Sequence, residues 1–354
     1  MLFPGRSSRH DLSITLHPME NGNGRPLKLR VLRAVPVLLV LGLLVHFLLP
    51  RIDTIENSLK TLRTMAPWAI GLSFTMEALS YVANGALLRS IVAMAGDRIS
   101  WRRAAAIEIG AGSVALVAAG ALGFGAAIYR WARSGGVSAD AALLASWLPS
   151  VFDAAALIVF ALISGVELIL VHQLSRLTVI ALVIVVSLLT IVIVTAIVLL
   201  ARNDWMRALS KNVSRIVKRF RPHWDNSGLT ATVESAAETW KEMRHGGWLR
   251  PASCSLMQVA FDLLCLRYAF LAAGHSLHLT LLLAGYGVPL LLGRASFLPG
   301  GIAVVEVAMI ALYGGLGVPA SIAVVAVLTY RLISFWIPAL VGIPIAVTLH
   351  SSKG

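Results

Sequence analysis

The chain has 354 residues, of which 58% are hydrophobic and only 13% are charged, and its mean hydropathy is +0.81. Several apolar runs approach the roughly 20 residues that span a bilayer and lack the alternation of membrane β-strands, which excludes a soluble globular protein and a membrane β-barrel. The formal net charge of +13 comes from basic residues that flank these runs, a pattern of membrane topology and anionic lipid surfaces rather than of nucleic-acid binding. We therefore expect an all-α polytopic membrane protein.

The first part of the chain predicts a tail and two spans. Residues 1–30 have the polar composition of a disordered tail, and a first span covers about 32–50. Basic residues before this span place the N-terminus in the cytoplasm. A second span, at about 67–92, returns to a cytoplasmic cluster of Arg98, Arg102 and Arg103.

Four further spans bring the predicted total to about six. They cover about 139–164, 176–201, 252–273 and 318–348. Residues 202–250 form a basic cytoplasmic insert, for which a helix on the membrane surface and a solvated loop are both open. The domain organisation is thus a tail (1–30), a first membrane half (31–201), the insert (202–250) and a second membrane half (251–354), with both termini cytoplasmic.

Two glycine-rich stretches do not fit single spans. Residues 104–132 and 278–315 each divide into pieces too short to cross a bilayer, which predicts two re-entrant or broken helix pairs. Non-helical backbone at membrane depth is tolerated only within protein or beside a wet cavity. We expect the turns at Gly123 and Gly125 in the first stretch, and at Pro299, Gly300 and Gly301 in the second.

The two stretches also resemble each other. A shift of 181 positions gives eight identities in 34 positions, all small residues or valine, among them Gly120 on Gly301 and Gly136 on Gly317. The predicted spans that precede the stretches run in opposite directions. Together these features predict an inverted-topology repeat, the plan of many secondary transporters.

Several ionisable side chains lie at membrane depth, where each is costly unless it faces a partner or a cavity. They are Glu77, Glu108, Asp153, Asp262, Arg294, Glu306 and Arg331. We expect Arg294 and Glu306 to meet across the turn, either as a structural ion pair or with the arginine on a lipid phosphate. Arg331 has no acidic residue within one helical turn, so it is the stronger phosphate-binding candidate. Glu306 could alternatively relay a proton.

The remaining candidates leave alternatives open. Arg130 either extends to the headgroups at the membrane surface or binds a substrate headgroup. Asp153 and Asp262 are secondary candidates that either pair locally or act in transport. The sequence predicts no metal site, and Cys254 and Cys265 lie too far apart on one helix to form a disulfide.

Several motifs resemble the lysylphosphatidylglycerol synthase transmembrane-region family over about residues 30–348. In the second half they are Pro299-Gly300-Gly301-x-x-x-x-Glu306, Gly317-Val318-Pro319, Tyr330-Arg331, Trp336-x-Pro338 and Gly342. In the first half they are Gly123-x-Gly125-x-x-x-Tyr129-Arg130 and Gly136-Val137-Ser138. The family often has glycine where this chain has Ala303, which implies a less open turn.

The resemblance implies lipid translocation. We expect the protein in a bacterial cytoplasmic (inner) membrane, with the following substrate-binding residues: Tyr129, Arg130, Arg294, Glu306, Tyr330 and Arg331. The resemblance does not imply the synthase activity, because the sequence lacks the soluble aminoacyl-transferase domain of the full-length synthases. We expect a flippase of a phospholipid or other polar-headed lipid, without catalytic activity or cofactor.

The rival interpretations are a scaffold for lipid-synthesis enzymes and, more distantly, a membrane enzyme acting on a lipid. Whether the protein forms a homodimer stays open.

Overall fold

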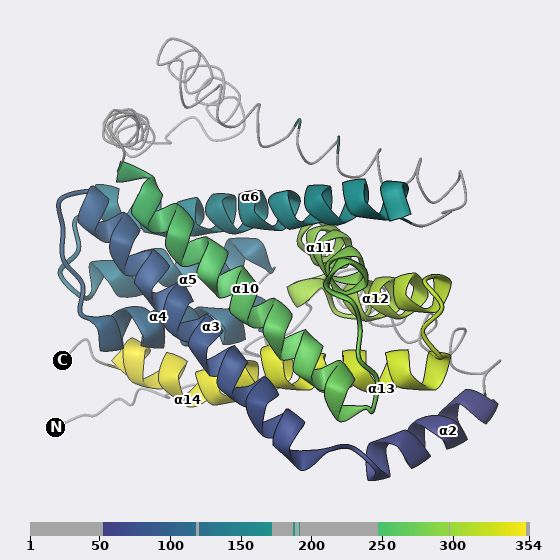
Figure 1. Cartoon of the computed structure of the whole chain (residues 1–354). Helices are drawn as coiled ribbons and strands as arrows, with labels where there is room; N and C mark the ends of the chain where they lie inside the picture. Colours follow the sequence, from purple (N-terminus) through teal and green to yellow (C-terminus); the bar gives the residue numbers. More distant parts are fainter. Residues whose placement is uncertain are drawn as a thin grey trace, which may run out of the picture. The chain divides into compact units, whose positions relative to one another are not determined.

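The computed structural model describes residues 52–117, 120–171 and 247–351, apart from Phe297, and in addition Ser187 and Ile191. Every regular element in these residues is a helix (Figure 1). The described residues belong to one compact unit, His46–Gly354. The predicted tail, the spans at about 32–50 and 176–201, and the insert as far as residue 246 lie outside the described residues.

The first set of helices begins with α2 (Ile52–Arg63), an exposed helix, and continues with α3 (Pro67–Met94). Pro67 starts α3 at a position where the missing N–H group costs no helical hydrogen bond. The chain then forms two short helices, α4 (Trp101–Val117) and α5 (Ala121–Arg133), and the long helix α6 (Ala139–Val171).

The second set follows the same order. It comprises α10 (Leu249–Ala272), α11 (Leu279–Ala295), the 3₁₀ turn η2 (Pro299–Gly301), α12 (Val304–Gly315), α13 (Ala320–Arg331), the π-helical turn η3 (Leu332–Trp336) and α14 (Ile337–Ser351). Because η3 joins α13 to α14 without a break, Ala320–Ser351 is one helical segment of 32 residues.

Among the described residues, three segments are long and apolar enough to cross a membrane: Ala139–Ile163, Leu249–Ala272 and Ala320–Ser351. They correspond to the predicted spans at about 139–164, 252–273 and 318–348. The helix predicted at about 67–92 is also present, as α3. It is not among these three, because Glu77, Asn84, Arg89 and its serines lower its hydropathy.

Both glycine-rich stretches form pairs of short helices, as predicted. In the second stretch the chain turns where expected: Gly300 and Gly301 have φ angles of 62° and 64°. In the first stretch the predicted turn position is wrong, because the chain turns at Gly120 (φ 56°), whereas Gly123 and Gly125 lie inside α5. Gly125 instead allows close packing, since a Cβ atom there would lie 3.0 Å from the carbonyl oxygen of Ser146 on α6.

The two sets of helices match in length and in the positions of their turns. The first set has helices of 28, 17, 13 and 33 residues, and the second has helices of 24, 17 and 12 residues before the 32-residue segment. Glycines with positive φ follow the corresponding helices in both sets: Gly96 and Gly274, Gly120 and Gly301, Gly136 and Gly317. Such conformations favour glycine because it has no Cβ atom.

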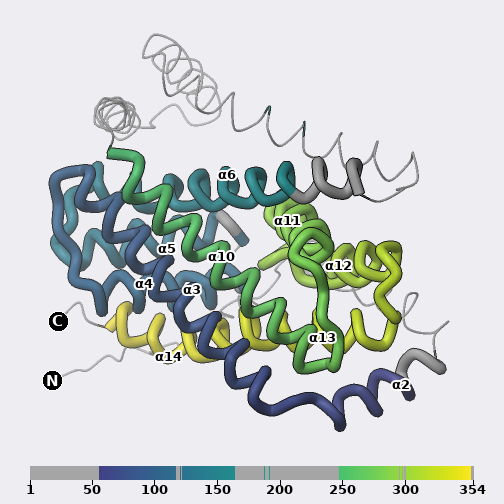
Figure 2. The backbone as a smooth tube through the Cα atoms, viewed as in Figure 1, coloured from purple at the N-terminus to yellow at the C-terminus, as the bar shows by residue number. Residues whose placement is uncertain are grey.

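Packing between the sets is reciprocal. The first helices of the two sets, α3 and α10, pack along each other (Figure 2). The second helix of each set packs on the last helix of the other, α4 on α14 and α11 on α6. Ionisable side chains are buried among the apolar residues of these helices and of α13: Glu77, Glu108, Asp262 and Arg331.

Candidate functional site

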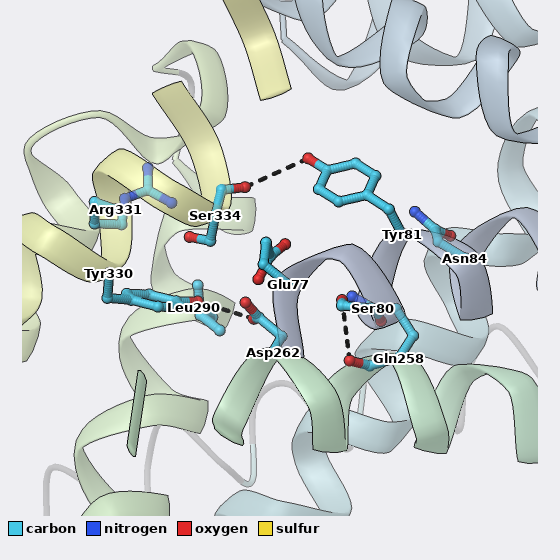
Figure 3. A pocket seen from close by; sticks show the side chains of 10 residues that line it. All are labelled: Glu77, Ser80, Tyr81, Asn84, Gln258, Asp262, Leu290, Tyr330, Arg331 and Ser334. Atoms are coloured by element: carbon cyan, nitrogen blue, oxygen red, sulfur yellow. Dashed lines mark hydrogen bonds between the residues drawn. The ribbon is translucent and has the colours of Figure 1, made fainter. Parts of the chain in front are cut away.

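A polar cavity of about 140 Å³ lies where α3, α10 and the α13–η3 segment meet (Figure 3). It is lined by Glu77, Ser80, Tyr81, Asn84, Gln258, Asp262, Leu290, Tyr330, Arg331 and Ser334. Most of these side chains have polar ends, although the helices that carry them are mainly apolar. The cavity is therefore a polar space among mainly apolar helices.

Two carboxyl groups face each other at this cavity. Glu77 on α3 and Asp262 on α10 are only 6% and 8% exposed, and Figure 3 shows their side chains directed toward one another. Asp262 Oδ2 accepts hydrogen bonds from the hydroxyl groups of Tyr286 (2.6 Å) and Tyr330 (2.8 Å). Charge-assisted hydrogen bonds of this kind stabilise an ionised carboxylate.

Arg331 connects the cavity to the turn before α12. Its Nε atom donates to Glu306 Oε1 at 2.7 Å, and its Nη2 atom donates to the carbonyl oxygen of Gly300 at 3.1 Å. Its guanidinium group also lies over the Phe335 ring, 4.4 Å from the ring centroid. The positive charge of Arg331 is thus already balanced by a carboxylate within the protein.

The predicted contact between Arg294 and Glu306 is wrong. Arg294, at the end of α11, lies 3.6 Å from Asp153 on α6, and Asp153 also accepts a hydrogen bond from Ser255 at 2.9 Å. The reason is the packing of the helices around the turn: α11 lies against α6, whereas the first turn of α12 faces Arg331. The two arginines therefore have different partners, and Asp153 and Asp262 are not isolated.

A third buried carboxyl group, on α4, extends the polar region beside α3. Asn84 donates to Glu108 Oε2 at 3.3 Å, and Glu108 on α4 is 3% exposed. The other rim of the cavity is closed by Tyr81, whose hydroxyl group donates to the carbonyl oxygen of Ser334 at 3.4 Å.

Tyr129 and Arg130 are not part of this cavity. Both lie on α5 with exposed side chains, and neither belongs to the cavity lining. Their predicted role in substrate binding therefore has no geometric support at this site. Arg130 lies in the last turn of α5, where a cation interacts favourably with the helix dipole.

An apolar groove of about 320 Å³ adjoins the polar cavity. Its lining includes Phe74, Ala78, Val82, Trp101, Ala105, Ile109, Ile333, Ile337, Pro338 and Val341. Glu77 and Tyr81 line both the groove and the polar cavity, so these two residues mark where the spaces meet. Large apolar side chains at the groove, such as Trp101 (42% exposed) and Val341 (50% exposed), face outward. In a bilayer such surfaces contact lipid.

Sequence reasoning missed part of the site. Glu77 and Glu108 stood out as charges at membrane depth but not as site residues, and Tyr81, Asn84, Gln258, Tyr286 and Ser334 were not singled out. A usable signal exists on α3, where Glu77, Ser80, Tyr81 and Asn84 recur at the spacing of one helical face. Gln258 and Asp262 repeat this spacing on α10.

Among the described residues, no group of three or more His, Cys, Asp or Glu side chains is placed to hold a metal ion. The model of one protein family, described as lysylphosphatidylglycerol synthase TM region, matches residues 33–342. The match includes every residue of the polar cavity and of the groove. No curated protein matches the chain.

Proposed function

The chain belongs to the lysylphosphatidylglycerol synthase TM region family, and from this premise we propose that it moves a polar-headed lipid between the leaflets of a membrane. The family match supports a membrane protein with a lipid-related function. One observation carries the finer proposal: the polar cavity joins the apolar groove at Glu77 and Tyr81. Two adjoining spaces of opposite polarity suit a molecule that has a headgroup and a hydrocarbon chain.

The dimensions fit this assignment. The polar cavity, at about 140 Å³, is smaller than the apolar groove, at about 320 Å³, as a headgroup is smaller than a hydrocarbon chain. The groove lies between α3, α4 and α14, and its outward-facing apolar side chains give a lipid chain a route to the bilayer.

The charges of the cavity favour a headgroup that carries a positive group beside its phosphate. Glu77 and Asp262 line the cavity, and the single guanidinium group there, that of Arg331, is paired with Glu306. A headgroup with only negative charge would meet carboxyl groups without a free cation among the lining residues. We therefore narrow the expected substrate to zwitterionic or cationic lipids such as phosphatidylethanolamine.

The architecture is consistent with a transporter. The matching helix lengths, the three pairs of left-handed glycines and the reciprocal packing support the inverted-topology repeat as part of this proposal. The polar cavity would then lie between the halves, near the middle of the bilayer. We place the protein in a bacterial inner membrane with both termini in the cytoplasm, as the basic residues beside the spans favour.

The test is leaflet exchange of labelled phosphatidylethanolamine in vesicles that contain the purified protein. Ala78→Trp would fill the groove, so it should reduce protein-dependent exchange at least about tenfold, the effect of 1.4 kcal/mol on the barrier. Ala311→Trp is the matched control, because Ala311 is also exposed but lines neither space. Folding of each variant is checked by size-exclusion chromatography and circular dichroism. Absence of protein-dependent exchange for every lipid tested would contradict the proposal and favour a scaffold.

A further inference from the structure

We propose that Glu77 is a proton-carrying residue, and that its proton exchanges for the positive group of the lipid headgroup as the lipid moves. This inference rests on the proposed function and adds a driving force to it: an outward flux of lipid would be coupled to an inward flux of protons, or the reverse. It begins from the contact between the two carboxyl groups of the polar cavity.

The carboxyl groups of Glu77 and Asp262 are both buried and are directed toward each other in the polar cavity, and a hydrogen bond between them requires a proton (Figure 3). Two buried carboxylates side by side repel each other strongly, so the pair shares a single proton in a site without a bound cation. The two tyrosine hydroxyl groups already donate to Asp262 and thereby favour its ionised form. We therefore assign the shared proton to Glu77.

The second oxygen of the Glu77 carboxyl group is available to a ligand. Among the described residues no donor reaches Glu77 Oε2, although the atom is buried and the side chain is 94% buried within a cavity wall. Glu77 is also the one charged residue that lines both the polar cavity and the groove in the part of the chain described. A headgroup that enters from the groove meets Glu77 first.

No neighbouring cation is free to neutralise Glu77, so Glu77 is the group that can exchange a proton for a cation. Arg331, the nearest cation, is held by Glu306, and Arg294 is held by Asp153 on α6. Tyr81 on α3 itself donates to the carbonyl oxygen of Ser334. The other titratable groups around Glu77 come from α10 (Asp262 and Cys265), α11 (Tyr286), α13 (Tyr330) and α4 (Glu108). None of these supplies a free positive charge.

Exchange follows from charge balance. When Glu77 releases its proton, the two carboxylates carry a charge of −2, which the cavity tolerates only with a cation between them. An ammonium group of a lipid supplies that cation and binds both carboxylates. When the lipid leaves, a proton returns to Glu77 and restores the hydrogen-bonded pair. The proton and the ammonium group thus occupy the site alternately, one for one.

The experiment uses vesicles that contain the full chain and labelled phosphatidylethanolamine, with a pH difference of one unit across the membrane. Because phosphatidylethanolamine is net neutral, each exchange moves one charge, so the membrane potential is held at zero with potassium and an ionophore. One proton exchanged per lipid would then drive a leaflet imbalance of about tenfold at steady state, because one pH unit corresponds to a tenfold ratio. Glu77→Gln keeps the shape and a hydrogen-bond donor but carries no exchangeable proton. In this variant the ratio of labelled lipid between the two leaflets should stay near one. Glu56→Gln, at an exposed glutamate on α2, should behave as the parent.

The outcomes separate this inference from the proposed function. Lipid exchange that is unaffected by the pH difference, or that follows a sodium gradient instead, overturns proton coupling and leaves the flippase intact. If the parent moves no lipid, the proposed function fails. Infrared spectroscopy of the purified protein then tests separately whether Glu77 carries a proton. A protonated-carboxyl band at neutral pH that is weaker in Glu77→Gln supports the proton site. A band of equal strength in both proteins overturns it, as does its absence from the parent.

Discussion

Arg331 Nε lies 2.7 Å from Glu306 Oε1, and this contact joins the long C-terminal helical segment to the helix that follows the turn. The two residues are 25 positions apart, and both side chains are nearly buried, with exposures of 6% and 12%. The guanidinium group also binds the carbonyl oxygen of Gly300 within the turn. One side chain thus fixes the turn, α12 and one wall of the polar cavity together.

Removing this arginine should destabilise the protein strongly. Arg331→Gln leaves the Glu306 carboxylate buried without its partner, which should lower the free energy of unfolding by about 3–5 kcal/mol. Arg294→Gln is the comparison: its ion pair is longer, the arginine is 42% exposed, and Asp153 keeps the hydrogen bond from Ser255, so the loss should be smaller. Chemical unfolding in mixed micelles measures both. Similar losses for the two variants would show that Arg331 has no special structural role.

Replacing Ala303 with glycine should stabilise the fold. Ala303 has a φ angle of 67°, a conformation that costs an L-residue roughly 1–2 kcal/mol compared with its right-handed alternative. Ala303→Gly should therefore raise the free energy of unfolding by about 1 kcal/mol. Ala308→Gly, inside α12, should instead lower it by about 0.5–1 kcal/mol. If both variants lose stability in the same assay, the turn does not hold Ala303 in this conformation.

The lipid selectivity should follow the charges of the cavity. Labelled phosphatidylethanolamine should exchange between leaflets about tenfold faster than labelled phosphatidylglycerol, as a preference of 1.4 kcal/mol would give. The reason is that Glu77 and Asp262 favour a cationic group, whereas Arg331 is already neutralised. Parallel measurements in vesicles of the same bulk composition would check this ratio. Faster exchange of the anionic lipid would mean that Arg331 leaves Glu306 during transport.

A pH-dependent contact outside the membrane core is expected at Asp97, in the loop between α3 and α4. Its carboxylate accepts a hydrogen bond from the Ser138 N–H group at 2.7 Å, and the hydrogen bonds from Ser138 lower the pKa of Asp97 below its ordinary value. A lowered pKa in the folded state stabilises the fold above the ordinary aspartate pKa of about 3.9, and this contribution disappears as the pH falls through the folded value.

Asp97→Asn should accordingly reduce the unfolding temperature at pH 7, and the difference from the parent should shrink as the pH is lowered below about 4. Scanning fluorimetry over a series of buffers would follow it. Asp140→Asn, an exposed aspartate in the first turn of α6, serves as the comparison. A difference that is constant down to the lowest pH would assign the effect of Asp97 to something other than its charge.

The helices could be predicted from the sequence because their signals are local. Long apolar runs gave the three spanning segments, and clustered glycines gave the short helix pairs. The position of the first turn could not be found in this way. The sequence alone does not distinguish Gly120, Gly123 and Gly125 from one another. Only the three-dimensional structure shows that Gly120 is needed for a positive φ angle and Gly125 for close packing against α6.

The site was less accessible to sequence reasoning, because its contacts join distant residues. Among the ionisable residues singled out from the sequence, Asp262 and Arg331 line the polar cavity, and Glu306 pairs with Arg331. Their partners depend on how helices rotate about the turn, and no spacing rule distinguishes Arg294 from Arg331 as the partner of Glu306. Tyr286 carries no charge and lies in an apolar helix, so its hydrogen bond to Asp262 has no signature in the sequence.

The π-helical turn at Leu332–Trp336 determines which side of α14 faces α4. A wider turn of this kind behaves as a one-residue insertion into an α-helix. Removing one residue there would rotate α14 by about 100° about its axis. Gly342 would then leave its close approach to Ile109 and Ser113 on α4, and a side chain would take its place at that contact. The length of this turn, more than the identity of its residues, therefore sets the fit of α14 on α4, and insertions or deletions there should be tolerated less than substitutions.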